Sequence, residues 1–226
     1  MASGKEGGIS TWNWVFVPFV VTLAVTIVRL LGELNRWSHF WFNPEPGGGF
    51  APIGISWLVP FFGLYFGWKL ARAGHPPAGA LRQVLGSVGG MALLILGSAL
   101  AAAAGLSLPW MEVVLAVVSI GGVYVAYRPW PMMGKIHLAY GMAARAPVAL
   151  LMLFAIYGHW GTHYDVAPAG FPEMGPFAKW IFIGLLPQMT TWMVYTVTIG
   201  GLFAVGGAKL ARPNPLPGEA QSIDVG

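Results

Sequence analysis

The sequence predicts an all-α fold, a polytopic transmembrane helical bundle with about six membrane-spanning helices. Hydrophobic residues make up 56% of the 226 positions, more than the core of a water-soluble domain of this length requires. Charged residues make up only 9%, and most of them stand outside the long apolar runs or at their ends. Six of these runs are long enough to cross a bilayer, which takes about 20 residues in a helix.

The first three expected spans end at glycines or charged residues. Run 12–33 ends at Glu33, and run 50–70 follows three glycines and ends beside Lys69. Run 83–104 begins directly after Arg82. Charged side chains at these positions can reach water at the membrane surface, so the boundaries are typical of membrane spans.

The last three expected spans differ in length. Only residues 105–108 separate run 109–127 from the run before it, so we expect the two to form a tight helical hairpin. Run 135–158 begins at a lysine. Run 177–209 is over-long, and we expect it to tilt, to bend at Pro187 or to extend beyond the membrane.

Basic residues fall mainly on one side of this arrangement, which predicts its orientation. Short loops rich in Lys and Arg face the cytoplasm, so we expect a multi-pass protein of the cytoplasmic (inner) membrane with both termini in the cytoplasm. The net charge of +4 then reflects topology, and we expect no nucleic-acid partner. The cytoplasmic set is Lys5, Lys69, Arg72, Arg82, Arg128, Lys135, Lys209 and Arg212, and the outer set is Arg36 and Lys179.

The chain is expected to form one transmembrane domain, residues 1–210. Two outward-facing loops, 34–49 and 159–176, are long enough to cover the outer mouth of the bundle. Residues 211–226 carry three prolines and no apolar periodicity, so we expect a flexible cytoplasmic tail. Small residues in a GxxxG pattern, Gly63 and Gly67, favour close helix packing within the bundle or in a homo-oligomer.

Polar residues within the first span follow the period of a helix. Thr22, Thr26, Arg29 and Glu33 are spaced by four, three and four positions, so they share one face. A polar face at membrane depth has to point into the bundle, because lipid tails cannot satisfy its hydrogen bonds.

A second polar face lies in the sixth span, where Gln188, Thr191, Tyr195 and Thr198 are spaced by three, four and three positions. Arg145 and Gln188 each lie about eleven residues from the start of their spans, which places both near the middle of the bilayer at about 1.5 Å per residue. We therefore expect them to be neighbours.

The two arginines within the spans, Arg29 and Arg145, are the strongest functional signal. A guanidinium is costly in a membrane, and it suits two-point binding of a carboxylate or phosphate. One interpretation is a site for an anionic small molecule or a lipid headgroup, bound by Arg29, Arg145, Gln188 and Tyr195. In the other, each arginine is paired to an acid such as Glu33 or Glu112 and only holds the bundle together.

The segment after the fifth span contains the candidate catalytic groups. His159 and His163 are four positions apart, so they would share a face if the helix continued through them, as acid–base groups or ligands of a divalent metal ion would. Asp165 would orient one histidine, and Glu33 would supply a second carboxylate. Alternatively, the histidines only hydrogen-bond their own loop.

Three hypotheses follow for the function. The leading one is an outward-facing polar cleft between the first, fifth and sixth helices that binds an anionic or lipid-phosphate ligand, in a protein that binds or modifies membrane lipids. The second is a small-solute or ion transporter that uses the same polar faces as a path. The third is a non-catalytic subunit of a larger membrane complex.

Overall fold

A computed structural model describes residues 10–48 and 51–211. Helices are the only regular secondary structure in the described part, which contains no strand, and this confirms the predicted fold class. Five helical segments are long and apolar enough to cross a membrane. They are α1 (Thr11–Leu34), α3 (Ala80–Ala103), α4 (Leu108–Tyr127), α5 (Pro131–Gly158) and the run Pro176–Leu210, which holds α6 to α8.

The sixth helix of the bundle, α2 (Leu58–Arg72), is shorter than the predicted span. It has 15 residues, about 22 Å of helix, whereas the sequence predicts a helix from position 50. Residues 51–54 are not helical and lead into a single 3-10 turn, Ile55–Trp57. Pro52 and Gly54 explain the late start, because proline disfavours helix in the residue before it and glycine stabilises helix poorly.

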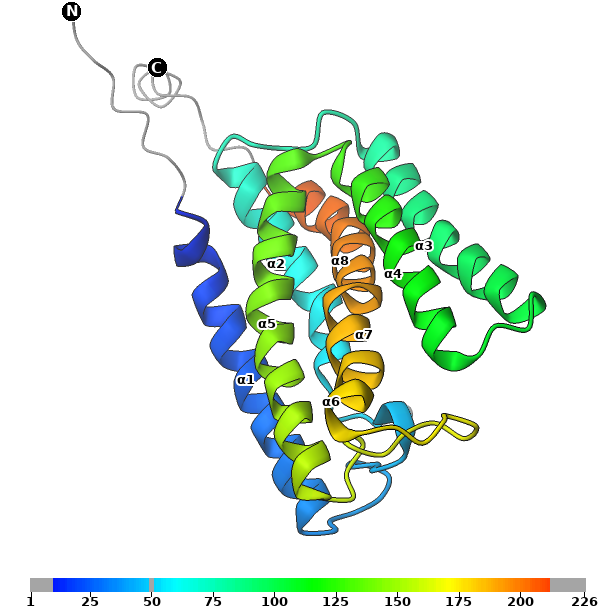
Figure 1. Cartoon of the computed structure of the whole chain (residues 1–226). Coiled ribbons are helices and arrows are strands. Elements are labelled where there is room, and N and C mark those ends of the chain that lie inside the picture. The colour runs from blue at the N-terminus through cyan, green and yellow to red at the C-terminus, as the bar shows by residue number, and fades with distance from the viewer. Residues whose placement is uncertain (1–9, 49–50, 212–226) are drawn as a thin grey trace, which may run out of the picture.

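The bundle is built around α8 (Thr191–Leu210), which packs against α2, α3, α4 and α5, while α1 packs mainly on α5 (Figure 1). The predicted hairpin of α3 and α4 is present. The start of α1 and the end of α8 lie at one end of the molecule, and the two predicted loops lie at the opposite end (Figure 1). The two loops can therefore meet over the same end of the bundle.

Glycines allow α2 and α8 to approach closely. A Cβ atom on Gly63 would lie 2.5 Å from the carbonyl oxygen of Gly200, and one on Gly67 would overlap the carbonyl of Ala204. The GxxxG pattern of α2 therefore lies at the contact with α8 within the bundle, where the small glycines allow the two helix backbones to touch.

The last span is discontinuous. It begins as α6 (Pro176–Lys179), widens into a π-helical segment (Trp180–Leu185), continues as α7 (Leu186–Met189) and is interrupted at Thr190, where φ is −125° and ψ is −77°. The irregularity surrounds Pro187, near the predicted bend. Proline has no N–H to donate, and π-helical segments frequently occur at functional sites.

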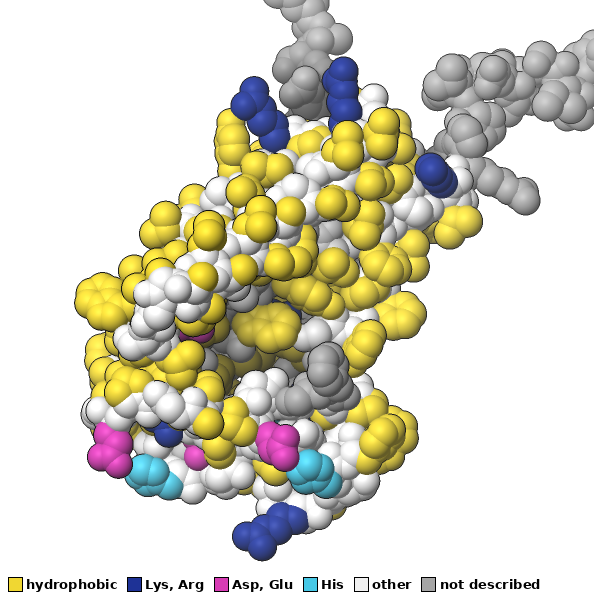
Figure 2. Space-filling view, turned by 90° about the vertical axis from the view of Figure 1, so that its right-hand side faces the viewer, with side chains coloured by type: hydrophobic (Ala, Val, Ile, Leu, Met, Phe, Trp, Pro, Cys, Tyr) yellow, Lys and Arg dark blue, Asp and Glu magenta, His cyan; other side chains and the backbone are white. Residues whose placement is uncertain are grey.

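The surface agrees with a membrane environment. Large apolar side chains point outward from the long helices, including Val17, Ile120 and Phe154, which are 61%, 71% and 62% exposed. On the face drawn in Figure 2, Lys and Arg side chains stand at both ends of the molecule, and acidic and His side chains gather at the loop end. Of the residues named above for topology, Lys5, Arg212 and the tail 212–226 lie outside the described residues.

Candidate functional site

A cavity of about 450 Å³ lies between α1, α5 and the last span, close to the loop end. Both loops contribute to its wall, together with the start of α4 and the non-helical segment before α2. Non-helical backbone is tolerated at membrane depth where it lines such a cavity. Its size is typical of a site for a small molecule or a lipid headgroup. Figure 2 shows a hollow in this face of the molecule, between the α3–α4 hairpin and the loops.

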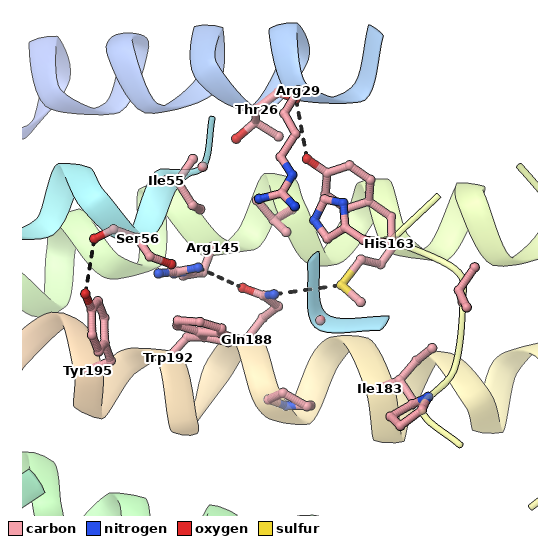
Figure 3. Close-up of a pocket in the computed structure, with 18 of the residues that line it drawn as sticks. Thr26, Arg29, Ile55, Ser56, Arg145, His163, Ile183, Gln188, Trp192 and Tyr195 are labelled. Atoms are coloured by element: carbon pink, nitrogen blue, oxygen red, sulfur yellow. Dashed lines mark hydrogen bonds between the residues drawn. The ribbon is translucent and has the colours of Figure 1, made fainter. Parts of the chain in front are cut away.

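Arg145 lines the cavity from the middle of α5 and is only 3% exposed. Its Nη1 donates a hydrogen bond to Oε1 of Gln188 at 3.4 Å, which confirms that the two are neighbours. Its guanidinium lies over the ring of Trp192, 4.6 Å from the centroid (Figure 3). No carboxylate within the described residues forms an ion pair with it. Arg145 is thus a buried cation that faces a cavity with an amide and a ring as its protein partners.

The interrupted last span positions the groups opposite Arg145. Gln188 follows Pro187 in α7, and Trp192 is one helical turn further along, so both side chains point to the same side. Tyr195 lies another turn beyond Trp192, and its hydroxyl donates to the carbonyl of Ser56 at 3.3 Å (Figure 3). This bond ties the last span to the non-helical segment that precedes α2.

The polar face of α1 points into the bundle as predicted. Thr22, Thr26, Arg29 and Glu33 are between 1% and 9% exposed. Arg29 donates from Nε to Oε1 of Glu33 at 2.8 Å and from Nη2 to the carbonyl of Gly48 at 2.9 Å. Arg29 therefore has its acidic partner in Glu33, in contrast to Arg145.

Glu33 also binds the second loop. The backbone N–H of His163 donates to its Oε2 at 2.9 Å, and the imidazole Nδ1 lies 2.5 Å from its Oε1. The carboxylate side chain is fully buried and joins α1 to both loops through Arg29 and His163. One carboxylate thus fixes the position of two groups that line the cavity.

The protonation state of His163 follows from this environment. Burial lowers the pKa of the imidazole below its usual value, and its contact with Arg29 acts in the same direction, against the opposing effect of Glu33. A neutral ring that faces a carboxylate through Nδ1 carries its proton there, which leaves the lone pair on Nε2. Burial likewise raises the pKa of the neighbouring Tyr164 phenol, so that side chain stays neutral.

The two predicted histidines do not share a helix face. α5 ends at Gly158, and His159 adopts a left-handed conformation with φ of 50° and points to solvent. Asp165, which was predicted to orient a histidine, forms no hydrogen bond with one among the described residues. Its carboxylate accepts hydrogen bonds from the backbone N–H groups of Gly161 and Thr162 at 2.9 and 2.7 Å, so it stabilises its own loop, and Glu33 holds His163 instead.

The sequence also predicted that His159 and His163 could bind a divalent metal ion, close to an acidic side chain. Across residues 10–48 and 51–211, no group of three or more His, Asp or Glu side chains is placed to hold a metal ion. The two carboxylates near His163 already have hydrogen-bond partners. Glu33 binds Arg29 and His163, whereas Asp165 binds groups of its own loop.

Sequence reasoning treated Glu112 only as a partner for an arginine, yet it lines the cavity from α4. Its Oε2 atom is buried and accepts no hydrogen bond from the described residues. Trp192 was missed altogether. The sequence could have indicated both residues. Glu112 is the one acidic residue inside run 109–127, and Trp192 lies four positions after Gln188, on the same face of a helix.

The fold and the cavity define a class of protein: a multi-pass helical membrane protein with a cavity beneath two loops that is lined by a buried arginine. Comparison with known protein families, with curated proteins and with solved structures gives no match to this chain.

Proposed function

We propose that this protein binds the phosphate-bearing headgroup of a membrane lipid in the cavity, with Arg145 as the principal anion-binding group. The supporting observation is that Arg145 is 3% exposed, faces the cavity and has no acidic partner within the described part of the chain. An uncompensated guanidinium at membrane depth is costly. An anionic ligand removes that cost, and a phosphate fits the planar fork of its N–H donors.

A lipid is favoured as the ligand by the walls of the cavity. Val148, Met152 and Phe182 line it alongside Arg145, so a molecule with an anionic head and an apolar tail matches both kinds of surface. The hollow in Figure 2 lies in a side of the molecule that carries exposed apolar side chains, where a lipid could enter from the membrane.

The proposal includes a topology. The basic residues Lys69, Arg72, Arg82, Arg128 and Lys135 stand at helix ends remote from the two loops. By the rule that basic loops stay in the cytoplasm, we place both termini in the cytoplasm and the cavity toward the outer side of the cytoplasmic membrane.

Modification of the bound lipid is a second candidate, favoured by the pair of Glu33 and His163 in the cavity wall. A neutral imidazole with Nδ1 held by a carboxylate can accept a proton at Nε2, and the carboxylate then stabilises the imidazolium. His163 would be the acid–base group in such a reaction, and Glu33 the residue that orients it.

Transport through the bundle receives less support. Phe66, His137 and Tyr140 are all at most 1% exposed and pack edge to face between the cavity and the basic end. Tyr140 also shares a hydrogen bond of 2.9 Å with Thr22 of α1. A path across the bundle would require this packed layer to separate.

The test is a binding measurement on the purified protein. Wild type should retain dioleoyl phosphatidylglycerol in preference to dioleoylglycerol, which lacks the phosphate, when both are titrated in native mass spectrometry. Arg145→Gln should weaken phosphatidylglycerol binding about tenfold or more, the usual range for hydrogen bonds to a charged group.

Arg36→Gln is the matched control, because it removes the same charge from an exposed site at the loop end. It should leave binding unchanged. Equal retention of both lipids by wild type, or equal affinities in Arg145→Gln and wild type, would contradict the proposal.

A further inference from the structure

Glu112 is the acidic group of the cavity. It lies in the second turn of α4 and lines the same cavity as Arg145. Its Oε2 is buried, and no described residue donates a hydrogen bond or forms an ion pair with the carboxylate. A buried carboxylate oxygen without a donor is costly, so Oε2 favours a ligand that donates a hydrogen bond to it.

Glu112 and Arg145 lie at about the same height in the bundle. Glu112 stands 15 positions before Tyr127, the last residue of α4, and Arg145 stands 14 positions after Pro131, the first residue of α5. At about 1.5 Å per residue, they are about 22 and 21 Å along their helices from the turn that joins them. Both can therefore contact one ligand that lies across the cavity.

The guanidinium of Arg145 and the carboxyl group of Glu112 form no ion pair in the described structure. The cavity consequently has a positive pole at Arg145 and, when the carboxyl group of Glu112 is ionised, a separate negative pole. We propose that its ligand is a zwitterion that carries a phosphate for Arg145 and a primary ammonium group for Glu112. This inference rests on the proposed function, because it assumes that Arg145 binds the phosphate.

A primary ammonium fits better than a quaternary one. The carboxylate of Glu112 lacks hydrogen-bond donors, and a primary ammonium supplies three, whereas a trimethylammonium supplies none. Quaternary ammonium groups are instead recognised by aromatic faces. The ring of Trp192 is already covered by Arg145, and other aromatic side chains also line the cavity, so the preference for a primary ammonium rests on the donors that Glu112 lacks. The shared chemistry is that of phosphoethanolamine, as a lipid headgroup or as a free molecule.

The first test needs no variant. Purified wild-type protein is titrated with dioleoyl phosphatidylethanolamine, dioleoyl phosphatidylglycerol and dioleoyl phosphatidylcholine, with retention measured by native mass spectrometry. Phosphatidylethanolamine should bind about tenfold or more tightly than either of the others, because only it satisfies both poles. Equal binding of all three lipids would overturn the inference and leave the phosphate site standing.

The second test uses Glu112→Gln, which keeps the shape but removes the charge. It should weaken phosphatidylethanolamine binding about tenfold or more and leave phosphatidylglycerol binding equal or tighter. Glu45→Gln, at an exposed loop position, is the control and should change neither. Unchanged phosphatidylethanolamine binding in Glu112→Gln would show that Glu112 acts as a neutral acid, and would overturn the inference.

Arg145→Gln separates this inference from the proposed function. If Arg145→Gln weakens both lipids and Glu112→Gln weakens neither, the phosphate site stands and the ammonium site fails. If Arg145→Gln weakens neither lipid, the proposed function fails, and with it the inference.

Water-soluble competitors distinguish the source of the ligand. Displacement of bound lipid by O-phosphoethanolamine, but not by glycerol 3-phosphate, supports a zwitterion recognised through its head alone. Displacement only by lysophosphatidylethanolamine, but not by lysophosphatidylglycerol, supports the lipid form. The inference is overturned if O-phosphoethanolamine and glycerol 3-phosphate displace the lipid equally, or if lysophosphatidylethanolamine and lysophosphatidylglycerol do.

Discussion

Replacement of Glu33 by alanine should destabilise the protein more than any change at an exposed acid. The Glu33 side chain is completely buried and accepts hydrogen bonds from Nε of Arg29 at 2.8 Å, from the backbone N–H of His163 at 2.9 Å and from its Nδ1 at 2.5 Å. Glu33→Ala removes all three and leaves Arg29, which is only 9% exposed, without its counter-ion.

The size of the effect can be worked from these contacts. Removing one partner of a buried ion pair costs about 3–5 kcal/mol, because the other charge stays buried and uncompensated. For a protein of this length, 1 kcal/mol shifts Tm by about 2–4 °C. Glu33→Ala should therefore lower Tm by about 6–20 °C.

The assay is thermal unfolding of the purified protein in detergent, followed by tryptophan fluorescence. Glu45→Ala, at an exposed position, should shift Tm by less than about 2 °C, as surface changes usually do. A shift that small for Glu33→Ala would refute the reasoning, since it would mean that the Glu33 contacts do not hold α1 and the loops together.

Two further predictions concern packing and pH. Gly67→Val should lower Tm by several degrees, because its side chain would collide with the backbone of Ala204, whereas Gly121→Ala, which has open space, should not. Burial holds the pKa of His163 below its unfolded value of about 6.5, so the unfolded state binds more protons in the interval between the two values. Stability should therefore fall as the pH drops below about 6.5, by up to about 1.4 kcal/mol per pH unit, and Tm measured from pH 7 to pH 5 should fall less steeply in His163→Asn.

Each of these two predictions can be contradicted by a specific result. Equal Tm values for Gly67→Val and Gly121→Ala would show that α2 and α8 are not in backbone contact. Parallel pH profiles of wild type and His163→Asn would show that the imidazole is not held neutral by its buried position.

Helical spacing predicted the parts of the site that lie on regular helices. The four-residue and three-residue steps from Thr22 to Glu33 identified the inward face of α1, and equal depth identified Arg145 and Gln188 as neighbours. Both inferences need only the rise and period of a helix and the demand that polar groups at membrane depth point inward.

The rest of the site depends on backbone that leaves the helical path. The helix predicted from position 50 begins at Leu58, and the segment before it lines the cavity. The contact between Glu33 and His163 joins positions 130 residues apart and depends on where α5 ends. Spacing along one helix carries no information about such contacts. The pairing of His159 with His163 required α5 to continue through both, and α5 ends at Gly158.

The most direct measurement of the central claim is an experimental structure of the protein in nanodiscs of phosphatidylethanolamine and phosphatidylglycerol. We predict a phosphate in the cavity with oxygens about 2.7–3.2 Å from the guanidinium nitrogens of Arg145. A cavity without a phosphate, in which Arg145 is instead paired with the carboxylate of Glu112, would contradict the account.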